Sequence, residues 1–394
     1  MTKSQKANHF LSSRSQVEPF HAMDVLAQAN RLQQQGQQID YLCVGQPAAP
    51  APAAARQAVA HHLKNGSIGY TDAAGRADLR DRLARHMVDT YGVDVDGSRI
   101  FITTGSSAGF ALSFLSLFDV GDRVAIAAPG YPAYRNILKA LGLHVVEIET
   151  HEEDRWAVTP EQVERVHSKT PLSGILIASP ANPTGTMMTP EALKQLIHCC
   201  ENLGIRFISD EIYHGLTYEE ETGVPAATAL QFSDKVVVIN SFSKYYCMTG
   251  WRVGWMILPT DCVRPVERLS QSLYISAPEL SQIAALHALD CKEELEKVRL
   301  TYLSNRQLLL DRLPQLGFEK IMPIDGAFYA YADATRHTND TMDFAKKMLV
   351  EAHVAVTPGL DFDQDRGHRY LRFSFAGDQK TMESALQRMA NWLA

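Results

Sequence analysis

The sequence contains few cysteines, and none of them forms a redox or metal-binding pattern. No CxxC pair and no metal-ligand spacing occurs among the six in 394 residues. Cys199 and Cys200 are adjacent in a segment that we expect to be helical, so their side chains point in different directions. We therefore expect no metal site, and free thiols in a reducing compartment. The six are Cys43, Cys199, Cys200, Cys247, Cys262 and Cys291.

The sequence also lacks a signal peptide, a membrane segment and a basic tract. The N-terminal MTKSQKANHF has no apolar core of the kind that secretion requires. The longest nearly apolar stretch, 109–118, is about half of the roughly 20 residues that a membrane helix needs. The formal net charge is −7, and no block of Lys and Arg stands out. We therefore expect a cytoplasmic protein with no membrane or nucleic-acid partner.

Two common phosphate-binding signatures are missing as well. The sequence contains neither GxxxxGK[ST] nor a GxGxxG at the spacing of a dinucleotide site. This argues against a nucleotide-dependent enzyme of either type.

Short β-rich runs alternate with helical patterns through the middle of the chain. Several runs are apolar on both faces, as in a covered, mainly parallel sheet. Helix start signals lie between them, with Thr159 and Thr189 each followed by Pro. The pattern predicts an α/β doubly wound domain. The runs are 99–105, 123–129, 144–150, 174–180, 206–213, 236–244 and 254–259.

The two ends of the chain differ from this middle part. A Pro-rich stretch at 45–55 leads into a helix near 53–64. From about residue 285 the pattern changes to a long helix at 291–312, then short strands around GAFYAYAD and YLRFSFAG, and a closing helix. A length of 394 residues also exceeds one ordinary core. We predict a large domain at 46–285 and a discontinuous small domain made of 1–45 and 286–394.

The segment SFSKYYCMTGWR at 241–252 carries the clearest chemical signal. Lys244 lies between two serines and eight residues ahead of Arg252. Cationic or desolvating neighbours lower the pKa of a lysine towards the free amine that attacks a carbonyl. Ser241, Ser243 and Arg252 are residue types that hold a phosphate. The apolar VVVIN before the segment and GWRVGWMIL after it argue against a surface turn.

The ends of neighbouring strands carry complementary groups, and ligands of open α/β sheets bind there. Asp210 ends RFISD, and a buried carboxylate beside a pyridine nitrogen keeps that nitrogen protonated. Tyr213 follows on the same loop. Asn182, in ASPANPTG, can donate a hydrogen bond to a phenolic oxygen. The alternatives are a helix N-cap for Asp210 and a structural loop position for Asn182.

Three further motifs have both a functional and a structural interpretation. Ser106 and Ser107 lie at a strand-to-helix junction, where backbone N–H groups bind phosphate or cap the helix. Tyr131, in APGYPAY, either stacks on a flat cofactor or packs in a turn. Arg372, in YLRFSFAG, either binds a carboxylate through both arms of its guanidinium or faces water from an edge strand.

Together these motifs resemble the class I/II aminotransferases, which are fold-type I enzymes that use pyridoxal phosphate. The resemblance extends from about Val17 to the C-terminus. It implies a large domain with a mainly parallel seven-stranded sheet covered by helices, a smaller α+β domain, and pyridoxal 5'-phosphate as cofactor. It also implies transfer of an amino group from an L-amino acid to a 2-oxo acid by a ping-pong mechanism.

The same resemblance suggests a role for each candidate residue. Lys244 would form the internal aldimine and then serve as the base that moves the α-proton, and the catalytic residues would be Lys244, Asp210 and Tyr131. Asp210 would pair with the pyridine nitrogen, Tyr131 would stack on the ring, and Asn182 and Tyr213 would bond the ring hydroxyl. The phosphate would be held by Ser106, Ser107, Ser241, Ser243 and Arg252. The substrate carboxylate would meet Gly45, Asn182 and Arg372.

Tyr70, in GYTDAAG, matches the family tyrosine that reaches the phosphate of the neighbouring subunit. The resemblance therefore implies a homodimer with a shared active site.

The substrates and some alternatives stay open. Ser107 stands where bacterial aspartate-specific members can carry a lysine, which argues against aspartate as donor. Tyr246 and Tyr274 suit an apolar or aromatic side chain, or else pack in the core. Either 2-oxoglutarate or pyruvate would serve as acceptor.

Three other activities share parts of the pattern. A cysteine-conjugate β-lyase or a cyclopropane-forming enzyme of the ACC synthase type would use the same lysine, aspartate and arginine. A non-catalytic ligand sensor would need a DNA-binding module, for which the roughly forty residues before VGQP are too few.

Overall fold

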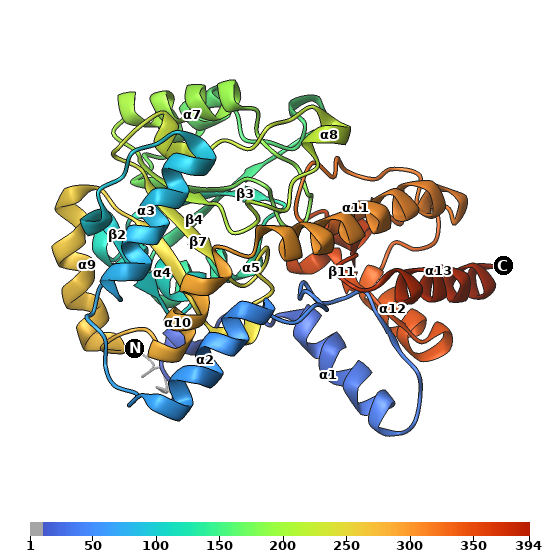
Figure 1. Ribbon diagram of the computed structural model, residues 1–394. Helices are drawn as coiled ribbons and strands as arrows, with labels where there is room; N and C mark the ends of the chain where they lie inside the picture. Colours follow the sequence, from blue (N-terminus) through green and yellow to red (C-terminus); the bar gives the residue numbers. More distant parts are fainter. Residues whose placement is uncertain (1–10) are drawn as a thin grey trace.

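The computed structural model describes residues 11–394 and divides into two lobes (Figure 1). The expected absence of a signal peptide and the expected start of the small domain both fall on residues 1–10, which lie outside the described residues. No helix within residues 11–394 is long and apolar enough to cross a membrane.

The larger lobe is built on a seven-stranded sheet with the order β2-β8-β7-β6-β5-β3-β4. Only β8 runs antiparallel to its neighbours, and the other pairings are parallel. The predicted mainly parallel sheet is therefore confirmed. The strands are β2 (Ile100–Thr103), β3 (Arg123–Ala128), β4 (His144–Glu149), β5 (Gly174–Ala178), β6 (Arg206–Asp210), β7 (Val237–Ser241) and β8 (Gly254–Ile257).

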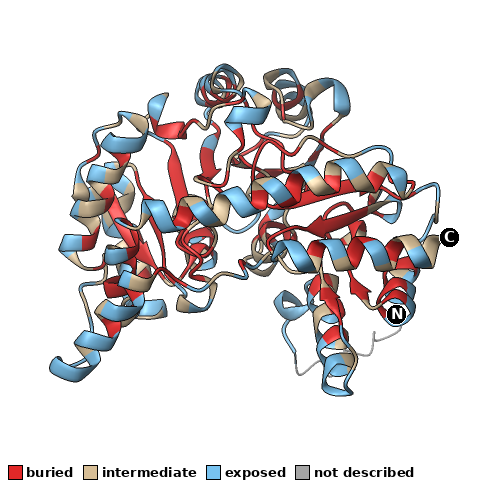
Figure 2. Ribbon diagram, turned by 45° about the vertical axis from the view of Figure 1, so that its right-hand side comes forward, coloured by how far each residue is buried: buried red, intermediate tan, exposed pale blue. Residues whose placement is uncertain are grey.

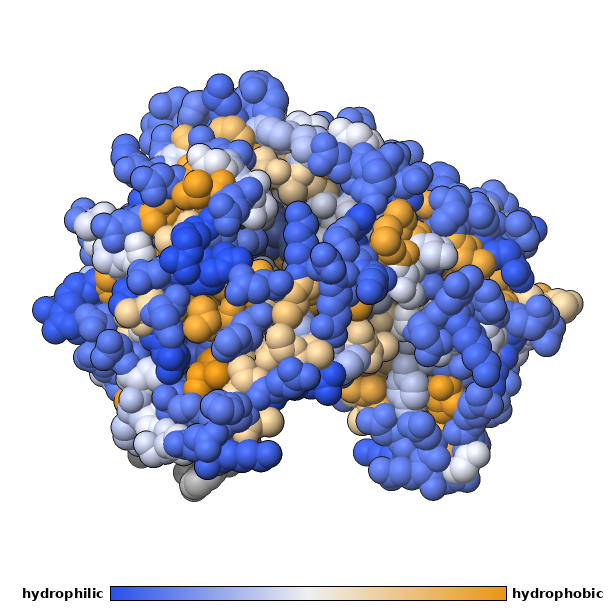
Figure 3. All heavy atoms as spheres, viewed as in Figure 1, coloured by the Kyte–Doolittle hydropathy of each residue, from blue (hydrophilic) through white to orange (hydrophobic). Residues whose placement is uncertain are grey.

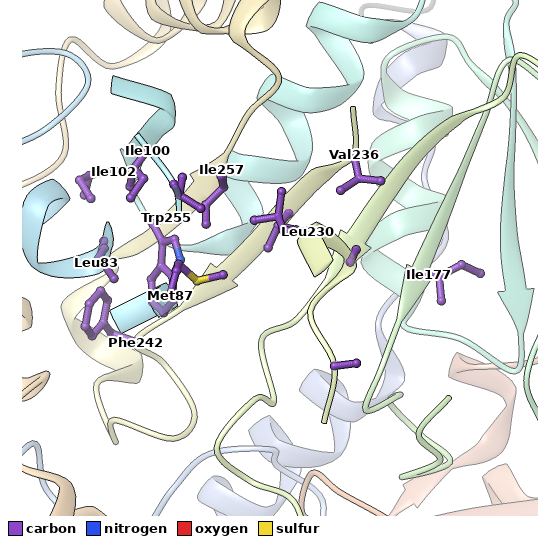
Figure 4. Packing of buried hydrophobic residues seen from close by; sticks show 14 of the residues in the cluster. Leu83, Met87, Ile100, Ile102, Ile177, Leu230, Val236, Phe242, Trp255 and Ile257 are labelled. Atoms are coloured by element: carbon purple, nitrogen blue, oxygen red, sulfur yellow. The ribbon is translucent and has the colours of Figure 1, made fainter. Parts of the chain in front are cut away.

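Helices cover both faces of this sheet because its strands are apolar on both sides. Ile100 and Ile102 face one helical layer, and Phe101 faces the other. Figure 4 shows the first layer, where Leu83 and Met87 approach Trp255. This layer contains α2 (Ala53–Asn65), α3 (Ala77–Tyr91), α6 (Pro160–Lys169), α7 (Pro190–Asn202) and α10 (Glu279–Ala288); the opposite layer contains α4 (Ser106–Leu117), α5 (Pro132–Ala140) and α9 (Thr260–Leu273).

The predicted helix starts have the expected caps. The Thr159 hydroxyl accepts a hydrogen bond from the Gln162 N–H, and Gln162 Oε1 accepts one from the Thr159 N–H. The Thr189 hydroxyl accepts the Ala192 N–H. The short helix α8 (Glu219–Thr222) follows β6.

The smaller lobe combines α1 with the C-terminal part of the chain and has its own apolar core, coloured red inside the right-hand part of Figure 2. Its antiparallel sheet has the order β11-β12-β9, and β1 pairs with β10 in parallel. Its elements are α1 (His21–Gln34), β1 (Asp40–Tyr41), α11 (Lys292–Gln315), β9 (Tyr329–Asp333), α12 (Thr341–Lys347), β10 (Val354–Ala355), β11 (Thr357–Pro358), β12 (Tyr370–Ser374) and α13 (Gln379–Leu393).

The two lobes leave a notch between the part that carries α2 and the part that carries α1 (Figure 3). The expected division at 46–285 stays a prediction, because α11 and the segment before α2 run between the lobes (Figure 1). The carboxyl ends of β3, β5, β6 and β7 meet at one edge of the large sheet, where the small lobe approaches it.

Candidate active site

A cavity of about 300 Å³ lies at this edge, within the range of small-molecule sites. Both lobes line it, because strand ends of the large sheet face β9, β12 and the start of α1. It brings together most of the predicted site residues: Gly45, Ser106, Ser107, Tyr131, Asn182, Asp210, Tyr213, Ser243, Lys244, Arg252 and Arg372.

One end of the cavity is suited to an anion. Ser106 opens α4, so backbone N–H groups of the first helical turn face this end. Gly105 precedes it with a φ of +80°, and a Cβ there would lie 2.5 Å from Arg252 Nη2. Only glycine therefore lets the guanidinium lie against the helix start. Ser243 and Arg252 complete the lining at this end, and Arg252 Nη1 donates to the Thr249 carbonyl at 3.0 Å.

Ser241 lies behind this group, outside the cavity lining. Its hydroxyl accepts the Ser243 N–H at 3.1 Å and lies 2.9 Å from the Ser243 hydroxyl. It thereby holds Ser243 in place.

Lys244 extends into the cavity and donates from Nζ to the Gly45 carbonyl at 2.7 Å. Burial, together with the nearby charges of Arg372 and Arg252, lowers its pKa to about 8, while the charge of Asp210 opposes this shift. Glycine at position 45 leaves room for Tyr329, because a Cβ there would lie 1.7 Å from the Tyr329 hydroxyl. The amine thus lies where it loses its proton more readily than an ordinary lysine.

Asp210 ends β6 and is only 2 % exposed. It accepts hydrogen bonds from the Tyr134 hydroxyl and, at 3.1 Å, from the Ile212 N–H. Burial raises its pKa to about 6, and these two bonds limit the rise. No helix starts at Asp210, so the side chain is not a helix N-cap. Tyr134 was not among the predicted site residues, although its spacing of three from Tyr131 at a helix start indicated a shared face.

Arg372 lies at the other end of the cavity, on the central strand of the small sheet and 3 % exposed. This buried position on a central strand rules out the alternative that Arg372 faces water from an edge strand. Its guanidinium lies 4.3 Å from the Tyr329 ring centre and 4.8 Å from that of Phe362. Nη1 donates to Asn182 Oδ1 at 2.9 Å, and Nη2 donates to the Cys43 carbonyl at 2.7 Å. Within the described residues, the buried Nε has no hydrogen-bond partner, so it remains free to donate to a ligand.

Aromatic rings line the space between these two ends. Tyr131 packs edge-to-face against Tyr134, with ring centres 5.3 Å apart. Burial raises the pKa of Tyr131 to about 12, so its hydroxyl stays protonated near neutral pH. The Tyr213 hydroxyl lies 2.9 Å from that of Tyr329. Tyr329 and Phe362 gave no signal in the sequence, because they come from different parts of the small lobe.

Three predicted tyrosines lie outside the cavity. Tyr70 is 82 % exposed and does not line the cavity of its own chain. Tyr246 packs against Phe242, with ring centres 4.8 Å apart, and Tyr274 packs beside the cluster around Phe101. For Tyr246 and Tyr274 the core-packing alternative is therefore correct, because their side chains face apolar clusters rather than the cavity.

Comparison with known proteins identifies the family of the chain. The family model of aminotransferase class I and II matches residues 38–389. The chain belongs to this aminotransferase family. It is 46 % identical over 384 residues to valine–pyruvate aminotransferase of Mycobacterium tuberculosis, covering 96 % of this chain and 97 % of the relative. It is 35 % identical to (5-formylfuran-3-yl)methyl phosphate transaminase of Methanocaldococcus jannaschii, covering 95 % and 97 %.

Solved structures of aminotransferases have the same fold. An aminotransferase from M. tuberculosis superimposes with a TM-score of 0.95 at 44 % identity, covering 97 % of this chain and 98 % of that chain. Aspartate aminotransferase from Thermus thermophilus with maleate gives 0.90 at 30 % identity, covering 97 % and 99 %. This aminotransferase is thus a pyridoxal-phosphate-dependent enzyme of the transaminase type, rather than a non-catalytic sensor. Among residues 11–394, no group of three or more His, Cys, Asp or Glu is placed to hold a metal ion.

The residues of the cavity fit this cofactor. Arg252 and the start of α4 form a cradle that a Cβ on Gly105 would fill. Asp210 provides a buried carboxylate, and Lys244 provides an amine that is held against the Gly45 carbonyl. Within the described residues, Arg372 adds a buried Nε that has no hydrogen-bond partner.

The lowered pKa of Lys244 predicts how the cofactor-free protein reacts with pyridoxal phosphate. Only the neutral amine attacks the aldehyde, so the rate of covalent capture should rise as the pH passes through about 8. The rate is measured by trapping the product with borohydride and locating it by mass spectrometry. Arg372→Gln should move the profile to higher pH, because it removes a cation that lowers this pKa. A profile centred near 10.5, the ordinary value for lysine, would contradict the prediction.

Proposed function

We propose that this aminotransferase moves the amino group of an apolar L-amino acid of about the size of valine to a small 2-oxo acid such as pyruvate. The observation that carries the proposal is the apolar wall of the cavity, formed by Phe20, Ala22, Met23, Leu26 and Val44. The name of the M. tuberculosis relative, valine–pyruvate aminotransferase, supports the same choice.

The charges in the cavity support it as well. The cations among the described lining residues are Lys244, Arg252 and Arg372. In our assignment the first supplies the amine, the second holds phosphate and the third holds the substrate α-carboxylate. This leaves no cation among the described lining residues for a second carboxylate on the donor. Ser107, which lines the anion end, is uncharged.

In this proposal the two ends of the cavity fix the reacting molecule between them. Ser106, Ser107, Ser243 and Arg252 bind the cofactor phosphate, and Ser241 acts through Ser243. Arg372 binds the α-carboxylate with its free Nε, and the Gly45 backbone lies beside it. Asn182 gives its oxygen to Arg372 and leaves its amide N–H groups to donate to the ring hydroxyl, together with Tyr213.

Proton handling falls to Lys244 and Asp210. Bound pyridoxal phosphate supplies the electron sink that stabilises the negative charge left when the substrate loses its α-proton. Lys244 Nζ would be the group that takes that proton from the substrate Cα and later gives it up again. The Asp210 carboxylate holds a proton on the ring nitrogen, and Tyr134 keeps this carboxylate oriented. Tyr131 stacks on the ring plane.

Replacing the lysine tests the central role. Lys244→Ala should lower the rate of transamination by about 10⁴-fold or more, because it removes both the covalent link and the base. Activity is followed as pyruvate-dependent loss of the amino donor, and the visible spectrum reports how the cofactor is held. Lys235→Ala is the matched control, since Lys235 is exposed just before β7. Near-normal activity in Lys244→Ala would refute the assignment.

A panel of amino donors tests the substrate class. With pyruvate as acceptor, kcat/KM for valine, leucine and isoleucine should exceed that for aspartate by about 100-fold or more, because an unpaired carboxylate would be buried against the apolar wall. A cysteine conjugate is added to the panel and assayed without any acceptor. Release of ammonia from it would reveal β-lyase activity. An equal or higher kcat/KM for aspartate would overturn the proposed donor.

We also propose that the enzyme is a homodimer in which Tyr70 reaches the phosphate site of the partner, since its exposed ring lies away from the cavity of its own chain. Tyr70→Phe should lower activity, and mixing it with Lys244→Ala under conditions that exchange subunits should restore part of it. Each mixed dimer would contain one site with both Lys244 and a partner tyrosine. If mixing restores nothing, Tyr70 does not act across subunits.

Two further assignments belong to this proposal. We place the enzyme in the cytoplasm, where six cysteines that form no disulfide stay reduced. We place the domain boundaries at 46–285 for the large domain and at 1–45 with 286–394 for the small one, supported by the separate apolar clusters of the two lobes.

A further inference from the structure

Helix α1 forms one wall of the cavity although it belongs to the small lobe. Phe20 precedes the helix, and Ala22, Met23 and Leu26 follow on its first two turns; all four line the cavity. The Phe20 ring also packs edge-to-face on Tyr131, with centres 6.0 Å apart. The position of α1 therefore decides how much room a substrate side chain has.

The start of α1 has no cap of its own. Phe20 occupies the N-cap position and offers no side-chain acceptor. The missing acceptor comes from Asp361, 340 residues away in sequence from His21. Its Oδ1 accepts the His21 N–H and its Oδ2 accepts the Ala22 N–H, both at 2.8 Å. A carboxylate is favoured at a helix start by both hydrogen bonding and the helix dipole.

Asp361 is also connected, through its own backbone and the next residue, to the part of the cavity that contains Arg372. It is 2 % exposed, and its carbonyl accepts a bond from Arg135 Nη2 at 3.2 Å. The next residue, Phe362, lies against the Arg372 guanidinium, and its carbonyl accepts the Gly130 N–H at 2.9 Å beside Tyr131. One short segment thus contacts both the arginine and the helix.

We propose that Asp361 is a positioning residue that sets the distance between Arg372 and the apolar wall of α1, and so selects donors by side-chain size. This inference rests on the proposed function, in which Arg372 holds the α-carboxylate. Asp361 touches no substrate in this proposal; it acts through Met23 and Leu26.

The test compares a donor that reaches the wall with one that does not. Asp361→Asn keeps the shape of the side chain but turns an N–H group towards one of the helix N–H donors, so α1 loses part of its anchor. KM for valine should rise about tenfold, whereas KM for alanine should change less than about threefold, because its methyl group does not reach Met23. The affinity for pyridoxal phosphate should stay within about twofold.

A binding measurement accompanies the kinetics. α-Methylvaline and α-methylalanine have no α-proton to lose, so their dissociation constants follow from the spectral shift alone. Asp361→Asn should weaken only the larger of the two. Asp378→Ala is the control, since Asp378 caps α13 by accepting the Thr381 N–H at 2.8 Å, and α13 does not line the cavity. It should leave both constants unchanged.

Met23→Ala gives a second test that does not depend on folding, because this side chain is 52 % exposed. It should also raise KM for valine more than for alanine. The double variant should be little worse than Asp361→Asn alone, since both act on the same wall. Additive effects, or equal losses for valine and alanine, would show that Asp361 serves stability only.

The two proposals fail in different ways. If the wild-type enzyme does not use apolar donors, the proposed substrate class is wrong. If it does and Asp361→Asn leaves the ratio of valine to alanine unchanged, only the role of Asp361 is wrong.

Discussion

Lys244 shares a small buried cavity with two guanidinium groups and a single carboxylate, and the surrounding structure holds this excess of positive charge in place. Burial and like charge both favour the neutral amine, which is the form that reacts with a carbonyl. Such an arrangement costs folding free energy unless each charged group finds other partners. Arg372 has an amide, a backbone carbonyl and two aromatic faces, and Arg252 has the Thr249 carbonyl.

The two lobes together position the charged groups of the cavity and their partners. The large sheet delivers Asp210 and Lys244 from neighbouring strand ends, and it delivers the start of α4 as an anion site. It has no strand end opposite these groups. The small lobe provides the opposing side with Arg372 on a central strand, where ladder bonds on both sides fix the backbone. The reacting centre therefore lies between two rigid supports.

The sequence predicted what depends on local pattern. Seven apolar runs marked the large sheet, and polar residues at their ends marked Lys244, Asp210 and Asn182. Contacts between distant segments left no such pattern. Asp361 meets His21 across 340 residues, and Tyr134 reaches Asp210 across 76. Neither hydrophobic periodicity nor a local motif predicts a contact between such distant segments, and the wall formed by α1 was therefore not predicted.

The excess positive charge also makes the basicity of Lys244 respond to what is bound. A phosphate at Arg252 and a carboxylate at Arg372 would cancel the two cationic influences that lower the pKa of the amine. In the proposed assignment, the amine would be least protonated before either anion binds, and its pKa would rise as each anion arrives. It would then be the stronger base with both anions in place, which suits the proposed removal of a proton from carbon. In this proposal the same two arginines would serve both anion binding and the basicity of Lys244.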